Sequence, residues 1–78
     1  MTQKEYLINT RDRLQVVLNE DIEKANAIRN RYATLQGKTD ERSRELLRTC
    51  ISDMRCLRRH HERRLALLEK TLRLLEAL

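Results

Sequence analysis

The chain contains no proline and a single glycine, Gly37, which lies near its midpoint. Proline and glycine are the residues that most weaken a helix interior, so the sequence on each side of Gly37 can form one long helix. Aromatic residues, which strands favour, make up 3% of the sequence, and charged residues make up 37%. This composition predicts an all-α protein built from two long helices with solvated outer surfaces.

Apolar residues recur at intervals of three and four on both sides of Gly37, which is the pattern of one side of an amphipathic helix. Asp21 stands where a strict heptad repeat would place an apolar residue, and we expect Ile22 to take its place in the core. The predicted apolar stripes are Leu7, Leu14, Val17, Ile22, Ala25, Ile28, Tyr32 and Leu35 in the first half, and Leu47, Cys50, Met54, Leu57, His61, Leu65, Leu68, Leu72 and Leu75 in the second.

Capping signals mark the expected helix ends. Thr2 followed by Glu5 matches a capping box, and Gly37 suits the left-handed position after a helix. Thr39 or Asp40 can cap the next helix. A turn this short forces the two helices to lie antiparallel, so the predicted fold is a helical hairpin. The predicted elements are a first helix over about 3–36, a turn at 37–39 and a second helix over about 40–77, within one domain, 1–78.

A lone hairpin gives each helix only one neighbour, and chains this short rarely bury enough apolar surface alone. Leu67, Leu74 and Leu78, with Cys56, lie off the main stripe and widen the apolar surface toward the C-terminus. We therefore expect a homodimer that forms a four-helix bundle; a monomer and a complex with a different protein are the alternatives. The residues predicted to face the second hairpin or another partner are Leu47, Met54, Leu57, His61, Leu65, Leu68, Leu72 and Leu75.

Positive charge is concentrated in the second half of the chain. The net charge of +5 divides into +1 for residues 1–37, with six basic and five acidic residues, and +4 for residues 38–78, with eleven and seven. On a helical wheel the basic residues form a strip beside the apolar stripe. Long bundle helices also carry arginines for solubility and for pairing with glutamates four residues away, so a merely solvated surface is the alternative interpretation. We call the seven residues predicted to bind nucleic acid the arginine strip: Arg44, Arg48, Arg55, Arg59, Arg63, Lys70 and Arg73.

The chemistry of the arginine strip favours a nucleic acid duplex. Arginine offers a fixed fork of donors that suits phosphate oxygens, and it stays charged near neutral pH. Single strands are usually held by aromatic stacking, and the only aromatic residues are Tyr6 and Tyr32, of which Tyr32 is expected in the core. A duplex can be held by its shape, through phosphates and 2′-hydroxyls. We therefore predict sequence-independent binding of double-stranded RNA, with duplex DNA as the weaker alternative.

The run Glu45–Cys50, the pair Arg58-Arg59 and the segment Leu65–Lys70 form a pattern of spaced basic residues around a cysteine in the second helix. In this respect the chain resembles the small double-stranded-RNA-binding silencing suppressors of nodaviruses, which dimerise into antiparallel four-helix bundles. The resemblance implies a viral protein that suppresses RNA silencing by sequestering duplexes. It also implies that Arg48, Cys50, Arg55 and Arg59 face the RNA, although the helical wheel turns Cys50 toward the apolar stripe.

Other candidate chemistry is weaker. Cys56 and His60 share one side of the helix, and two copies could complete a Cys₂His₂ zinc site, but the arginines around them oppose a cation. We therefore predict no metal and no cofactor. Cys50 and Cys56 point in different directions and cannot bond to each other within one helix, which indicates reduced thiols and a cytoplasmic protein. His61 is expected as a hydrogen-bonded core histidine whose protonation makes dimerisation sensitive to pH.

The sequence contains no glycine-rich phosphate loop and no hydrolase or metalloprotease motif, so we do not expect an enzyme. The alternative function is that of a small helical chaperone or assembly factor, such as a type III secretion co-chaperone, which binds a partner helix through its leucine-rich side. Binding of the basic amphipathic helix to an anionic membrane surface is a third possibility. No uncharged stretch is long enough to span a bilayer, and residues 1–20 lack the apolar run of a signal peptide.

Overall fold

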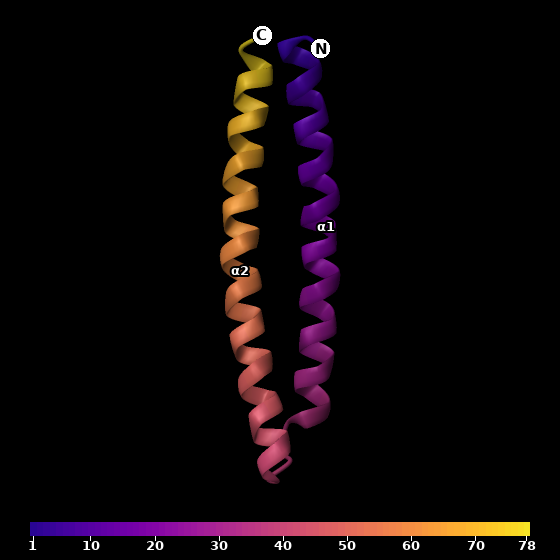
Figure 1. Cartoon of the computed structure of the whole chain (residues 1–78), viewed down its shortest axis with the longest axis vertical. Coiled ribbons are helices and arrows are strands. Elements are labelled where there is room, and N and C mark those ends of the chain that lie inside the picture. The colour runs from indigo at the N-terminus through magenta and orange to yellow at the C-terminus, as the bar shows by residue number, and fades with distance from the viewer.

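The computed structural model describes all 78 residues and consists of two helices, α1 (Gln3–Leu35) and α2 (Glu41–Glu76). The helices run antiparallel, so both termini lie at one end of the molecule and the turn lies at the other (Figure 1). The molecule is a rod measuring 57 × 16 × 15 Å. The all-α helical hairpin predicted from the sequence is thereby confirmed. Neither helix contains a segment apolar enough to cross a membrane.

The helix ends follow the predicted capping signals. The Thr2 hydroxyl accepts a hydrogen bond from the backbone N–H of Glu5 at 3.1 Å, and the Asp40 carboxylate accepts one from the backbone N–H of Ser43 at 3.1 Å. These side chains satisfy donors that would otherwise have no partner at a helix start. The hydrogen bonds from Ser43 hold the pKa of Asp40 below its ordinary value. Gly37 has a φ of +86°, a conformation that glycine adopts without steric cost, and it allows the chain to leave α1 and reverse.

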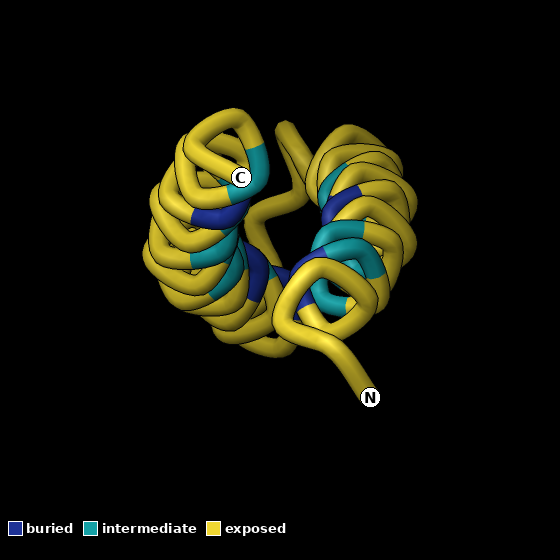
Figure 2. Tube along the Cα trace, turned by 90° about the horizontal axis from the view of Figure 1, so that it is seen from above, coloured by how far each residue is buried: buried dark blue, intermediate teal, exposed yellow.

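The two helices meet along a narrow seam in which every third or fourth residue faces the other helix (Figure 2). This spacing is a heptad repeat, as in a coiled coil. Only 7 of the 78 residues are buried, so a single hairpin has a very small core. The seam consists of Leu7, Arg11, Leu14, Leu18, Asp21, Ala25, Ile28 and Leu35 of α1, and Ser43, Leu47, Cys50, Met54, Leu57, His61, Arg64, Leu68, Thr71 and Leu75 of α2.

The prediction for the centre of α1 was wrong. Asp21 is 2% exposed and lies in the seam, whereas Ile22 is 54% exposed and lies outside it. The heptad repeat therefore continues through Asp21 without a shift, because the carboxylate finds partners on α2. Tyr32, which was expected in the core, is 37% exposed at the edge of the seam.

A second correction concerns the C-terminal half of α2. Leu65 and Leu72 were placed in the apolar stripe, but they are 41% and 39% exposed and do not face α1. Arg64 and Thr71 take the corresponding seam positions instead, and Thr71 is 3% exposed. Counting onward from His61 in alternating steps of three and four residues reaches positions 64, 68 and 71. Arg64 can lie in the seam because its guanidinium pairs with the Asp21 carboxylate.

Asp21, His61 and Arg64 form a cluster that we call the polar triad. His61 Nδ1 lies 3.0 Å from one carboxylate oxygen of Asp21, and the Arg64 guanidinium donates a hydrogen bond to the other. His61 is thus hydrogen-bonded in the seam, as expected. Burial alone would raise the pKa of Asp21, but the hydrogen bonds and charges of His61 and Arg64 lower it below its ordinary value. No buried polar side-chain atom lacks a partner.

The polar triad predicts a loss of stability in acid. Because the folded-state pKa of Asp21 is lowered, its contribution is complete above the ordinary value of 3.8 and is lost as the pH falls through the lower, folded-state value. We expect the melting temperature followed by circular dichroism to fall below about pH 4. An Asp21→Asn variant should show a smaller fall over the same pH range. Parallel curves for the two proteins would show that Asp21 does not contribute to the acid response.

Candidate nucleic-acid interface

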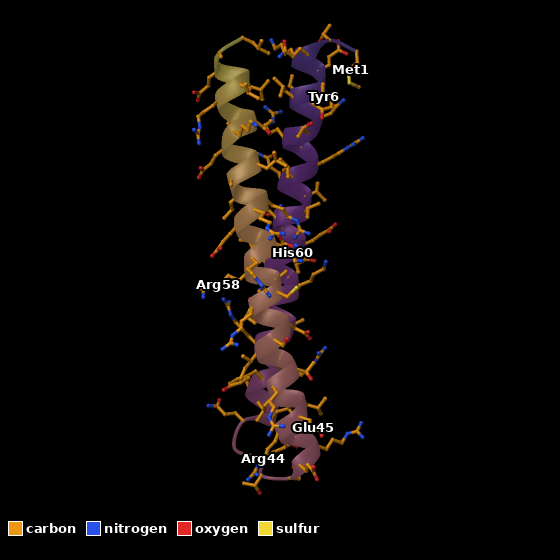
Figure 3. All side chains as sticks on the ribbon, turned by 60° about the vertical axis from the view of Figure 1, so that its left-hand side comes forward. Met1, Tyr6, Arg44, Glu45, Arg58 and His60 are labelled. Atoms are coloured by element: carbon orange, nitrogen blue, oxygen red, sulfur yellow. The ribbon has the colours of Figure 1, made fainter.

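All seven residues of the arginine strip are exposed on α2. The strip extends from Arg44 near the turn to Arg73 near the termini, a distance of about 44 Å at the roughly 1.5 Å rise per residue of a helix. In Figure 3, Arg44 projects away from the hairpin at the turn end of this surface. Because α2 is one uninterrupted helix, the spacing of these cations is fixed by the backbone.

Most of the arginine strip is free of ion pairs. Arg73 alone approaches a carboxylate, that of Glu69, at 3.7 Å, and the other six residues have none within 4.0 Å. The neighbouring arginines outside the strip differ in this respect. Arg58 lies 4.0 Å from Glu62, and Arg64 is paired with Asp21 in the polar triad. The charges of the strip are thus available to an anionic ligand.

Three residues of the arginine strip surround a shallow hollow of about 370 Å³ on the surface of α2. Arg48, Arg55 and Arg59 line it together with Ile51 and Ser52. The residues are separated by multiples of about one helical turn, so their side chains emerge on one side, and the small Ser52 leaves space between them. Three guanidinium groups around one hollow form a surface suited to the oxygens of a phosphate.

The structure removes one residue from the candidate RNA-binding surface. Cys50, which the resemblance to nodavirus suppressors placed against RNA, is 1% exposed and lies between the helices. The helical wheel placed it correctly, and the resemblance did not. Arg64, although it lies within the densest run of arginines, is half-buried against Asp21. Its separation of three residues from His61 was the sequence signal that it continues the seam.

A groove of about 700 Å³ runs between the helices on one side of the seam. Ala25 is small and leaves a gap in the packing, so that Ile28, Met54 and Leu57 become accessible from this side. Sequence reasoning did not find the groove, because its depth depends on which side chains meet across the two helices. Its lining consists of Asp21, Ile22, Ala25, Ile28, Arg29, Tyr32, Cys50, Ile51, Met54, Arg55, Leu57, Arg58 and His61.

The remaining candidates offer little chemistry. Both cysteines are free, with Cys50 buried and Cys56 exposed. No group of three or more His, Cys, Asp or Glu side chains is arranged to hold a metal ion. The arginine strip is therefore the most distinctive chemical feature of the surface.

Comparisons of this chain with known protein families, with curated proteins and with solved structures give no match.

Proposed function

We propose that the hairpin binds double-stranded RNA in the cytoplasm, without sequence preference, through the arginine strip. The observation that carries this proposal is the row of exposed cations from Arg44 to Lys70, none with a carboxylate within 4.0 Å, along about 39 Å of one rigid helix. Neutralising phosphates releases counterions, and this supplies most of the affinity of sequence-independent binding. Such binding requires correctly spaced charges and no enclosed pocket.

A duplex fits this surface better than a single strand. Single-strand binders present aromatic side chains on which bases stack. Here Tyr32 lines the groove between the helices and Tyr6 belongs to α1 near the termini, so neither lies within the strip. A straight rod can lie along a duplex and contact phosphates on both sides of a groove. Readout by shape favours RNA over DNA, because the shallow minor groove of RNA exposes its 2′-hydroxyls.

We propose that the active form is a homodimer. Twelve large apolar residues are exposed in the hairpin, and only 7 residues are buried, which leaves an isolated hairpin with little to stabilise it. Pairing two hairpins into a four-helix bundle would bury part of this surface. A dimer would also present two arginine strips. By the resemblance to nodavirus proteins, binding in this manner would sequester duplexes from the enzymes that process them.

The proposal is tested by mobility-shift titrations of duplex RNA, duplex DNA and single-stranded RNA, each at two salt concentrations. We expect the tightest binding to duplex RNA, little dependence on sequence, and a steep loss of affinity with salt. For a B-form duplex the logarithm of the binding constant falls by about 0.9 per neutralised phosphate for each tenfold rise in salt. Equal affinity for single strands, or affinity independent of salt, would contradict the proposal.

A second candidate function is supported by the leucines that lie outside the seam. Leu67, Leu74 and Leu78 are 48%, 42% and 62% exposed, and they could hold an apolar helix of another protein, as in a chaperone or assembly factor. Light scattering separates the two functions. A uniform dimer supports the first function, and a monomer that aggregates in the absence of a partner supports the second.

A further inference from the structure

The side of the hairpin that carries the groove has a regular pattern of exposed residues, which we call the docking face. Its members follow every second seam position of each helix by one residue, and so they lie on the same side of the seam throughout. Ile22 and Arg29 of α1 and Ile51 and Arg58 of α2 line the groove, which establishes the side to which the series belongs. The docking face consists of Ile8, Gln15, Ile22 and Arg29 of α1, and Arg44, Ile51, Arg58, Leu65 and Leu72 of α2.

Beside the docking face on α2 lies a second row of residues, which follow the remaining seam positions by one residue. We call this row the flank, and its two halves carry opposite charges. Toward the turn it carries Arg48 and Arg55, which follow the acidic first residue Glu41, and toward the termini it carries Glu62, Glu69 and Glu76. The apolar residues are divided in the same way: the groove lies in the basic half, and Leu65 and Leu72 project from the acidic half.

We propose that a second copy of this chain docks on this face in the antiparallel orientation. A twofold axis perpendicular to the rod then places each helix against the same helix of the partner. It brings the basic half of each α2 flank against the acidic half of the other. Arg55 lies opposite the partner's Glu69, and Arg48 lies opposite the partner's Glu76. An interface of this kind is isologous, so that each contact occurs twice.

The apolar residues indicate the same axis. When Arg55 opposes the partner's Glu69, Ile51 comes opposite the partner's Leu72. The twofold axis then crosses α2 at the level of residues 61 and 62. On α1, Gln15 comes opposite the partner's Arg29 if the axis passes through Ile22, which then meets its own symmetry mate. The polar triad shows that these two levels coincide, because Asp21 contacts both His61 and Arg64 across the seam.

This arrangement also covers the groove. The partner's Leu65 and Leu72 lie over the levels of Arg58 and Ile51, which are lining residues of the groove. One long side of a rod 57 Å long and 15 Å across is comparable with the roughly 800 Å² per partner that a standard stable interface buries. The docking of leucines into an apolar hollow supplies the buried centre that such an interface requires.

The opposite side of the seam does not have this complementarity. It carries Lys24 and Arg31 toward the turn, and its flank carries Arg63 and Lys70 toward the termini. In the same antiparallel geometry α2 would lie against the partner's α2, so that Arg63 would come close to its own symmetry mate, and Asp53 opposite the partner's Lys70 would be the single complementary pair. Like charges in direct opposition are destabilising. The charge pattern therefore selects the docking face.

This dimer geometry rests on the homodimer of the proposed function. It separates the arginine strip into residues at the dimer interface and residues open to solvent. Arg44 belongs to the docking face and Arg48 and Arg55 flank the docked partner's glutamates, whereas Arg59, Arg63, Lys70 and Arg73 remain open to solvent. RNA binding by the dimer would then depend chiefly on the open group. The dimer itself forms without RNA, so the two proposals can fail separately.

The twofold contact at Ile22 provides a direct test by crosslinking. In a Cys56→Ser background, which removes the exposed native thiol, Ile22→Cys should be joined to its symmetry mate by a short thiol-to-thiol crosslinker, giving mostly covalent dimer. Val16→Cys is the matched control, because Val16 is 58% exposed but points away from the docking face. An Ile22→Cys protein that stays monomeric, or equal crosslinking of both variants, would overturn the inference.

Charge exchange supplies the second test, with dimer dissociation followed by analytical ultracentrifugation. Arg55→Glu should weaken the dimer roughly tenfold, because two symmetry-related attractions become repulsions, and adding Glu69→Arg should restore it. Arg63→Glu, an equal charge change outside the face, should leave it unchanged. Failure of the double variant to recover would overturn the inference. A dimer that passes both tests without binding duplex RNA would refute only the RNA proposal.

Discussion

Replacing Arg55 and Arg59 by glutamate should reduce the affinity for duplex RNA by at least about 100-fold at moderate salt, because the phosphate contact of Arg59 becomes a repulsion and the loss of Arg55 weakens the dimer that presents both strips. Both residues line the hollow on α2, so the change removes two of its three guanidinium groups. Helix content should be unaffected, because both side chains are exposed and neither makes an ion pair. The measurement is a mobility shift on the same duplex, with circular dichroism on each protein.

The matched control is the double replacement of Arg13 and Arg31 by glutamate. These residues are also exposed, but they belong to α1, and the change in net charge is the same. We expect this control to bind with only a modest loss, from the general electrostatic attraction. Equal losses in the two double variants would show that net charge matters and the position of the strip does not. A third variant, Arg59→Glu with Arg63→Glu, changes only residues outside the docking face and should lose RNA binding while it remains a dimer.

The second large effect is expected at the polar triad. Asp21→Ala should destabilise the protein by about 2–3 kcal/mol, because it leaves the half-buried guanidinium of Arg64 without its carboxylate. For a chain of this size such a loss lowers the melting temperature by roughly 10–15 °C. Thermal unfolding followed by circular dichroism measures it, at fixed protein concentration because the stability of the proposed dimer would depend on concentration.

Two control variants distinguish the effect of losing the buried carboxylate from a general effect of substitution by alanine. Asp53→Ala replaces an exposed acidic residue in the middle of α2 and should change the stability by less than about 0.5 kcal/mol. Asp21→Leu combined with Arg64→Leu replaces the charged pair with apolar side chains and should recover most of the lost stability. If the double leucine variant is as unstable as Asp21→Ala, the loss arises from altered packing and the charges are not responsible.

The fold could be predicted because its determinants are local. The absence of proline, the position of Gly37 and the spacing of the leucines each depend on neighbouring residues, and Thr2 and Asp40 act within one helical turn. The polar triad was missed for the opposite reason. Asp21 looks like an interruption of an apolar pattern until its partners His61 and Arg64 are known, and these lie 40 and 43 residues away.

The candidate site was likewise predictable only where its features depend on a single helix. The exposure of the arginine strip follows from the geometry of a single helix, so the helical wheel gave the direction of these side chains. The burial of Cys50 was also predicted by the wheel. The groove could not be predicted, since it depends on the small side chain of Ala25 opposite Met54 and Leu57 on the other helix. The displacement of Leu65 and Leu72 from the seam depends similarly on a contact between the helices.

The placement of both chain ends at one extremity of the rod makes the relative direction of two associated hairpins measurable. A fluorophore attached to each C-terminus would be separated from its counterpart by nearly the full 57 Å of the molecule if the hairpins point in opposite directions. Hairpins that point the same way would bring the two dyes together. Energy transfer between labelled chains therefore distinguishes the two geometries without altering any residue of α1 or α2.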